Sequence, residues 1–99
     1  MPIAIFRVKD RSMQPSLNDG DYIIVNRLSY LFRRPNPGDI IVLRHPSNGM
    51  LIVKRVAYER NGMFYVTGDN AKESEDSKSF GFVSRSAVLG KVMRVIRKS

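Results

Sequence analysis

A serine near the start of the sequence has the setting of a catalytic nucleophile. Ser12 follows a strand predicted over Ile3–Val8 and stands three residues before Pro15, whose ring restricts the local backbone. On an exposed turn of this kind, neighbouring main-chain amides are free to hold a developing oxyanion. A loop serine can equally cap a turn with its hydroxyl, so Ser12 points to catalysis only if a base lies near it.

Lys54 is the residue that can supply such a base. It lies in a strand predicted over Met50–Tyr58, where side chains alternate, so that Ile52 and Val56 share its face. Burial among apolar groups lowers the pKa of a lysine and can leave it neutral, ready to activate a serine hydroxyl. The alternation leaves a second arrangement open, in which Arg55 faces inward and Lys54 lies on the exposed face.

A polar segment later in the chain can orient a catalytic side chain. It begins with Gly68-Asp69-Asn70 and continues through Ser74, Asp76, Ser77 and Lys78 to Phe80-Gly81. Short hydrogen-bonding side chains at this density are typical of a loop that folds back on itself and positions a neighbouring group. The same composition is also common in an ordinary solvated turn. The segment is therefore a candidate orienting loop.

Composition excludes several classes of enzyme. The chain has no cysteine and one histidine, His45, which removes thiolate catalysis, iron–sulfur clusters and cysteine-ligated or multi-histidine metal sites. We therefore expect no metal or other cofactor.

Seventeen Lys and Arg against nine Asp and Glu give a net charge of +8, which favours anionic partners such as nucleic acid, anionic lipid or an acidic polypeptide. His45 precedes Pro46 near a predicted hairpin end, and we expect it on the surface.

The elements that must position these residues are almost all β-strands. Runs rich in Val, Ile and Tyr alternate with turn residues, and Ser47-Asn48-Gly49 and Asn61-Gly62 have the composition of hairpin turns. The predicted strands are Ile3–Val8, Asp21–Asn26, Ile40–Arg44, Met50–Tyr58, Met63–Thr67 and Lys91–Ile96. One helical turn is predicted over Ser84–Leu89, capped by Ser84 and ended by Gly90. We predict a single domain over residues 1–99, folded as a small, mostly antiparallel β-barrel or coiled sheet.

No part of the sequence predicts a membrane span. A spanning helix needs about 20 mostly apolar residues, and the longest apolar runs, such as Ile40–Leu43, are far shorter. The first residues also lack the apolar stretch of a secretory leader. We expect a chain without a membrane anchor that works in the cytoplasm or, alternatively, at the periphery of a membrane. The residues expected to touch such a membrane are Leu28, Tyr30, Leu31, Phe32, Arg33 and Arg34.

Four ordered segments resemble the signal peptidase family, whose members use a Ser/Lys dyad. The family pattern comprises a Ser-Met-x-Pro-Thr/Ser-Leu box, a Gly-Asp strand start, a Lys-Arg-Val box and a Gly-Asp-Asn loop that runs on to Ser-x-Asp-Ser-Arg. The corresponding segments here are Ser12–Leu17, Gly38–Val42, Lys54–Val56, and Gly68–Asn70 with Ser74–Gly81. Single short motifs are weak, whereas an ordered set across most of a chain is specific. The resemblance implies the family's β-rich fold.

Within that family, Gly38–Pro46 followed by Val53–Val56 is similar to the central segment of nickel-type superoxide dismutase maturation proteases. The resemblance implies an endopeptidase that removes an N-terminal extension from a precursor polypeptide bound as an extended strand, with the nickel belonging to the substrate. The first alternative is a membrane-peripheral signal peptidase that cleaves secretory leader peptides. A basic β-barrel that binds nucleic acid is another, although no aromatic residues interleave the basic ones. The last alternative is a non-catalytic interaction domain.

The resemblance also assigns roles to individual residues. Ser12 would be the nucleophile and, through its main-chain amide, an oxyanion donor, while Lys54 would be the general base. Ser74 would hydrogen-bond and orient Lys54. Asp76 would pair with the basic residue Lys78 and so hold the loop.

Three positions depart from the family pattern. Lys78 replaces Arg, which keeps the charge but loses the bidentate fork, and Ser16 replaces Thr. Asp10 stands where Gly or a hydroxyl residue usually assists the oxyanion, and an ionised carboxylate cannot donate a hydrogen bond. We therefore expect Asp10 to point away from the site, or the reaction to be slow.

Overall fold

The computed structural model describes residues 2–98, so residues 1 and 99 of the predicted domain lie outside the described part of the chain. The strands are β1 (Ile3–Arg7), β2 (Tyr22–Asn26), β3 (Ile40–Arg44), β4 (Leu51–Arg60), β5 (Met63–Thr67), β6 (Val83–Ser84) and β7 (Val88–Ile96). Between them lie a short α-helix, α1 (Ser77–Phe80), and two 3₁₀ turns, η1 (Ala71–Glu73) and η2 (Arg85–Ala87). No helix within residues 2–98 is long and apolar enough to cross a membrane.

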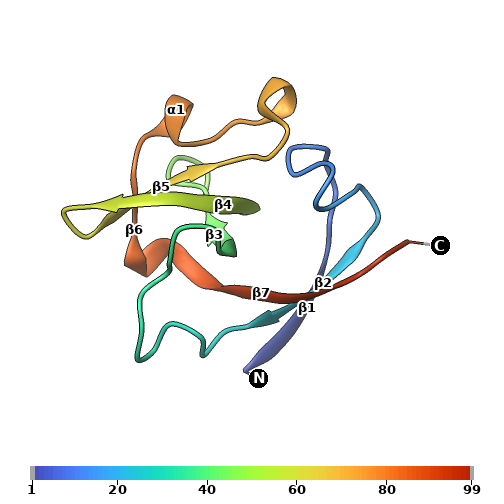
Figure 1. The fold of residues 1–99 in the computed structure, drawn as a ribbon, viewed down its shortest axis with the longest axis horizontal. Coiled ribbons are helices and arrows are strands. Elements are labelled where there is room, and N and C mark those ends of the chain that lie inside the picture. Colours follow the sequence, from blue (N-terminus) through green and yellow to red (C-terminus); the bar gives the residue numbers. More distant parts are fainter. Residues whose placement is uncertain (1, 99) are drawn as a thin grey trace.

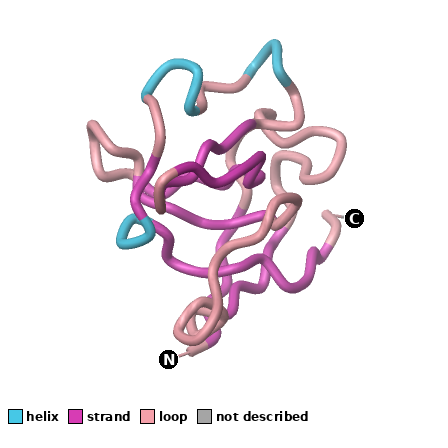
Figure 2. The backbone as a smooth tube through the Cα atoms, turned by 60° about the vertical axis from the view of Figure 1, so that its left-hand side comes forward, coloured by secondary structure: helices cyan, strands magenta, loops and turns pink. Residues whose placement is uncertain are grey.

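The seven strands form one sheet in the order β1-β2-β7-β3-β4-β5-β6, and all neighbouring strands are antiparallel. The sheet is strongly curled (Figures 1 and 2). β7 runs across the molecule between β2 and β3 (Figure 1). The loop after β1 and the segment that follows β5 come together on one side of the curl (Figure 1). The predicted all-β, mostly antiparallel coiled sheet is confirmed.

The turns follow the chemistry of their residues. Asn61 and Gly62 connect β4 to β5 with positive φ angles of 52° and 79°, as the tightest hairpin turns require. The predicted helical turn forms as η2, directly after Ser84, but it ends at Val88 instead of at Gly90. Gly90 lies inside β7, where an added Cβ would be 2.6 Å from the carbonyl oxygen of Asn26. This glycine therefore permits the close approach of β2 and does not end a helix.

Two groups of buried apolar side chains form the core. The first comprises Val8, Met13, Leu17, Ile23, Val25 and Val42, and the second comprises Ile41, Leu43, Val56, Phe64, Val66 and Val83. Met13 and Leu17 anchor the loop after β1 in the first group, because burying each such side chain stabilises the fold by about 1.5–3 kcal/mol. Val56 anchors the inner face of β4 in the second group. The two segments that carry Ser12 and Lys54 are thus fixed by packing.

Candidate active site

Ser12 lies in a compact turn that follows β1. The amide of Gln14 donates to the carbonyl of Arg11 (3.1 Å), and the amide of Leu17 donates to the carbonyl of Met13 (3.0 Å). Ser12 itself is only 3% exposed. The turn is thus held by its own main-chain hydrogen bonds as well as by its buried side chains, so the serine has a defined position.

Asp10 points towards Ser12, and the expectation that it turns away is wrong. Its Oδ1 atom accepts a hydrogen bond from the main-chain N–H of Ser12 (3.0 Å) and another from the Ser12 hydroxyl (2.9 Å). The physical reason is local, because an aspartate readily accepts from the amide two residues further along and closes a turn. The carboxylate therefore occupies both donors of the candidate nucleophile.

Lys54 faces inward from β4 and is 3% exposed, which decides between the two arrangements that the strand alternation left open. Its Nζ atom donates to Ser74 Oγ at 3.1 Å. Burial lowers the pKa of Lys54 below the ordinary lysine value of 10.5. The negative charges of Asp10, Asp76 and Glu75 oppose part of this shift. The ammonium form of Lys54 is thus disfavoured by burial and partly restored by three carboxylates.

The candidate orienting loop carries the hydrogen bond on from Ser74. Ser74 Oγ donates to Asp76 Oδ2 at 3.4 Å, and the amide of Gly68 donates to the same oxygen at 3.2 Å. Asp76 also caps α1, since its Oδ1 accepts from the main-chain N–H of Lys78 at 3.0 Å. Asp76 and Lys78 meet through that amide, and within residues 2–98 no ion pair joins the Lys78 ammonium to the Asp76 carboxylate. The helix cap therefore holds the loop.

The orienting loop packs directly on the turn of Ser12. The amide of Asn70 donates to the carbonyl oxygen of Ser12 at 2.8 Å, and the Asn70 side chain donates to the carbonyl of Arg11 at 3.1 Å. An added Cβ on Gly68 would lie 2.0 Å from Ser74 Oγ and 2.7 Å from the carbonyl oxygen of Ser12. The orienting loop therefore touches the turn of Ser12 at Gly68 and meets Lys54 at Ser74. Within the described residues, no hydrogen bond joins Ser12 Oγ to Lys54 Nζ, because the serine bonds to Asp10 and the lysine to Ser74.

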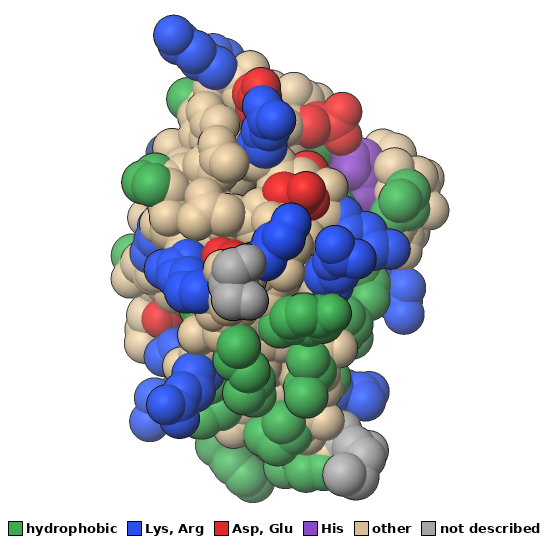
Figure 3. Space-filling view, turned by 90° about the vertical axis from the view of Figure 1, so that its right-hand side faces the viewer, with side chains coloured by type: hydrophobic (Ala, Val, Ile, Leu, Met, Phe, Trp, Pro, Cys, Tyr) green, Lys and Arg blue, Asp and Glu red, His purple; other side chains and the backbone are tan. Residues whose placement is uncertain are grey.

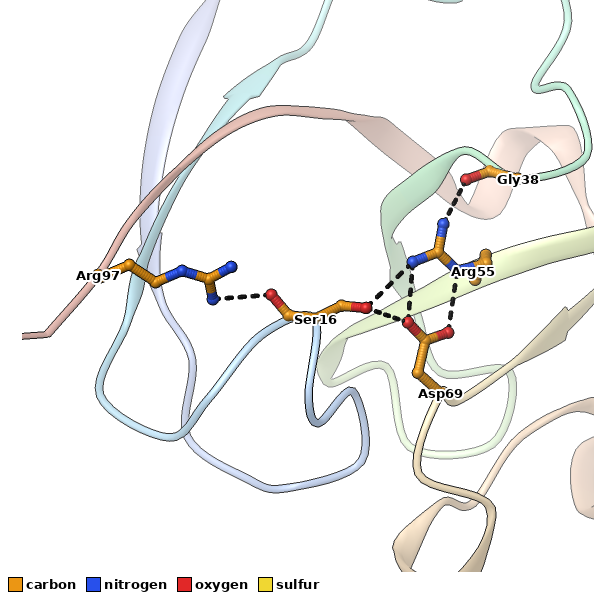
Figure 4. A network of polar contacts seen from close by, with 5 residues as sticks. All are labelled: Ser16, Gly38, Arg55, Asp69 and Arg97. Carbon is orange, nitrogen blue, oxygen red and sulfur yellow. Dashed lines mark hydrogen bonds and ion pairs between the residues drawn. The ribbon is translucent and has the colours of Figure 1, made fainter.

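Arg55, Asp69 and Ser16 form a network that braces this junction, and the sequence analysis missed it (Figure 4). Arg55 Nε and Nη2 donate to the two carboxylate oxygens of Asp69 at 2.9 and 2.8 Å, and Nη1 donates to the carbonyl of Gly38 at 2.7 Å. Ser16 Oγ donates to Asp69 Oδ2 at 2.5 Å. The Arg55 guanidinium holds the pKa of Asp69 below its usual range. A bidentate pair of this kind ties β4 to the start of the orienting loop.

His45 is buried at 8% exposure, so the expectation of a surface histidine is wrong. Its Nε2 atom pairs with the Glu75 carboxylate, its Nδ1 atom accepts from the Ser47 amide at 3.1 Å, and its ring meets Phe80 edge-on with centroids 4.8 Å apart. The hairpin between β3 and β4 lies against the orienting loop, which covers the ring. His45 thereby holds Glu75, the neighbour of Ser74.

A groove of about 500 Å³ borders the site at Asp10. It is lined on one side by the end of β1 and the following residues, 5–10 with Met13, and on the other by Val42 and residues 50–53 at the start of β4. Asp10 stands in this lining, two residues before Ser12, and the opposite wall ends one residue before Lys54. Among the described residues, no cluster of three or more His, Asp or Glu side chains could hold a metal ion.

Comparison with known proteins places these residues in a family context. The family model described as signal peptidase, peptidase S26, matches residues 1–57 and 60–96. The chain is 34% identical to mitochondrial inner membrane protease subunit 2 of Danio rerio over 93% of this chain and 63% of that protein. It is 27% identical to the probable signal peptidase I-1 of Synechocystis over 80% of this chain and 63% of that protein. It is also 38% identical to signal peptidase I of Aquifex aeolicus over 52% of this chain and 20% of that protein.

The chain spans less than two thirds of the length of these relatives. The matched part nevertheless includes Ser12, Lys54 and the orienting loop, whose geometry is described above. With a family match across nearly the whole sequence and a curled antiparallel sheet that joins the predicted segments, the chain belongs to the signal peptidase (peptidase S26) family.

Proposed function

We propose that this chain is a serine endopeptidase in which Ser12 is the nucleophile and Lys54 is the general base. The observation that carries the proposal is a buried lysine of lowered pKa, held by a hydroxyl of the loop that also packs on the main chain of Ser12. A lysine is a useful general base only when its ammonium form is disfavoured, and burial supplies that condition here. Membership of the signal peptidase family supports the same assignment.

In the proposed acylation, Ser12 Oγ attacks the scissile carbonyl carbon and its proton passes to the neutral amine of Lys54. The main-chain N–H of Ser12 donates to the oxyanion. The Lys54 ammonium then protonates the leaving amine as the C–N bond breaks. In deacylation, a water attacks the ester and gives its proton to Lys54, which returns a proton to Ser12 Oγ as the ester bond breaks. Ser74 would keep Lys54 oriented between these transfers.

The substrate we propose is an extended polypeptide that lies in the groove. β1 stands at the edge of the sheet, so within residues 2–98 one side of this strand has no neighbouring strand. An extended segment can add there through main-chain hydrogen bonds, with its alternate side chains in the groove. The lining includes apolar side chains, and apolar substrate residues therefore fit best. The apolar lining side chains are Ile5, Met13, Val42, Met50 and Leu51.

The finer proposal is that the substrate is the precursor of a nickel-type superoxide dismutase, from which the enzyme removes a short N-terminal extension. It rests on the similarity of Gly38–Pro46 and Val53–Val56 to the maturation proteases of that enzyme. The nickel would bind to the trimmed substrate, and the peptidase would work without a cofactor. In this version the reaction takes place in the cytoplasm.

A second candidate, a signal peptidase that works at a membrane surface, is favoured by exposed apolar side chains. Figure 3 shows hydrophobic side chains gathered over the lower part of one face, with basic side chains around them. The strand register places Ile3, Ile5, Tyr22 and Ile96, all exposed, on one face of β1, β2 and β7, and it pairs Tyr22 with Ile96. The loop between β2 and β3 adds Leu28, Leu31 and Phe32, the last 98% exposed. Exposed apolar surface with a basic rim suits an anionic lipid surface.

The test is mass spectrometry of the purified protein mixed with a nickel-type superoxide dismutase precursor and, separately, with a secretory preprotein. Ser12→Ala and Lys54→Ala should each abolish cleavage, whereas Ser79→Ala and Lys72→Ala, changes of the same type at exposed positions, should not. Cleavage of the first substrate alone supports the maturation protease. Cleavage of the preprotein alone supports the signal peptidase. A folded Ser12→Ala variant with full activity would refute the mechanism.

A further inference from the structure

Asp10 is the polar side chain at the site that the proposed mechanism leaves without a role. Its Oδ1 atom accepts from both the main-chain N–H and the hydroxyl of Ser12. These are the two groups that acylation requires, the first to donate to the oxyanion and the second to attack and lose its proton. As long as this carboxylate keeps both hydrogen bonds, neither group of Ser12 is available to a substrate.

Asp10 is also one of three carboxylates whose charge acts on Lys54. The other two are held by their own partners. Glu75 pairs with His45, and Asp76 accepts from the amides of Gly68 and Lys78 and from the Ser74 hydroxyl. Asp10 alone among the three comes from the turn that carries the serine, and it lines the groove. Asp10 therefore interacts with both members of the candidate dyad, with Ser12 through hydrogen bonds and with Lys54 through its charge.

We propose that Asp10 is a positioning residue that keeps the site in a resting state, in which its carboxylate occupies both donors of Ser12. The inference rests on the proposed peptidase function. A peptide that enters the groove reaches Asp10 before Ser12, and productive binding requires the carboxylate to release the serine. An ionised carboxylate left in place would repel the oxyanion and favour the ammonium form of the base.

Removal of this charge should make Lys54 easier to deprotonate. Asp10→Asn keeps the shape of the side chain, and Asp10→Ser supplies a hydroxyl that can donate to the oxyanion. In both variants the acid limb of the kcat/KM profile should move to lower pH, by about one unit at most, because an opposite charge that favours the ammonium form of Lys54 is lost. At a pH below that limb, kcat/KM should rise by up to about tenfold. Asp19→Asn, the same change at an exposed position in the same loop, should alter neither quantity.

Two measurements on the full chain test the proposal. One is the pH profile of peptide cleavage, and the other is an NMR titration of the Lys54 side-chain nitrogen in ¹⁵N-lysine-labelled protein, which requires no activity. The expected result is a lower titration midpoint for Lys54 in Asp10→Asn and Asp10→Ser, matched by the shift of the acid limb. Unchanged midpoints in two folded variants would overturn the proposal, as would a loss of cleavage at every pH. A shifted midpoint in a protein that cleaves no substrate would support the Asp10–Lys54 coupling and refute the peptidase function.

Discussion

The bidentate pair between Arg55 and Asp69 allows a quantitative test of what holds the orienting loop against the serine. Asp69→Asn preserves the size of the side chain but leaves one acceptor oxygen and adds an NH₂ group. That group must face the Arg55 guanidinium in either orientation, because Arg55 donates to both carboxylate oxygens, and at the Oδ2 position it also faces the Ser16 hydroxyl. The substitution therefore removes the ion pair and at least one of three hydrogen bonds.

The expected cost follows from burial. The side chains of Arg55 and Asp69 are 34% and 17% exposed, so solvent screens the pair only in part. Hydrogen bonds to charged groups contribute about 1.5–3 kcal/mol each, and loss of one partner from a mostly buried pair costs about 3 kcal/mol. The pair of Arg34 and Glu59 has a contact of 2.7 Å, but its side chains are 65% and 26% exposed. Glu59→Gln should therefore cost less than about 1 kcal/mol.

Urea and thermal unfolding followed by circular dichroism measure both variants. For a domain of this size, about 3 kcal/mol lowers Tm by roughly 12 °C or more, and the urea m-value should stay unchanged. Cleavage should also weaken in Asp69→Asn, because the next residue, Asn70, donates to the main chain of Ser12. Equal stability of the Asp69→Asn and Glu59→Gln variants would refute the reasoning, since the two pairs differ in burial and in the number of hydrogen bonds to the carboxylate.

Two further predictions concern the same site. Gly68→Ala should lower both Tm and cleavage, because the new Cβ would lie 2.0 Å from Ser74 Oγ and 2.7 Å from the Ser12 carbonyl; a fully active variant would show that the loop can move without loss. Lys54→Met should abolish cleavage yet raise stability at neutral pH, because burial lowers the pKa of Lys54 and so penalises its ammonium form in the folded state. This gain in stability should shrink as the pH rises and vanish above about 10.5, where the lysine is also neutral in the unfolded chain. Chemical unfolding of the wild-type and Lys54→Met proteins at several pH values measures it. A gain that does not change with pH would contradict the burial argument.

The strands were predictable because their patterns are local. All six predicted strands match observed ones within three residues at each end, and the two Gly-containing turns lie where the composition indicated. β6 was missed because Val83–Ser84 is too short to show a period. The outer face of β1 could not be told from a core face, since Ile5 is as apolar as the buried side chains on the other strands.

At the site, the sequence pointed to the residues but not to their contacts. Alternation in β4 could not decide whether Lys54 or Arg55 is buried, and packing of Val56 in the core settles the question in the structure. The Arg55–Asp69 pair could have been predicted, because the hairpin register aligns Arg55 with Thr67 and the chain then continues to Asp69. The burial of His45 could not be predicted from the sequence, since it depends on contact with a loop 30 residues further along the chain.

The position of β7 in the sheet governs the order in which the molecule can assemble. β7 is the last strand in the sequence, yet it is the link between β2 and β3 and therefore between the two halves of the sheet. The hairpins of β1 with β2 and of β3 with β4 and β5 involve near neighbours and can form early. The two halves cannot become one continuous sheet until residues 88–96 are available. Folding should therefore be completed by a single late step that closes a long loop, which is slow compared with hairpin formation.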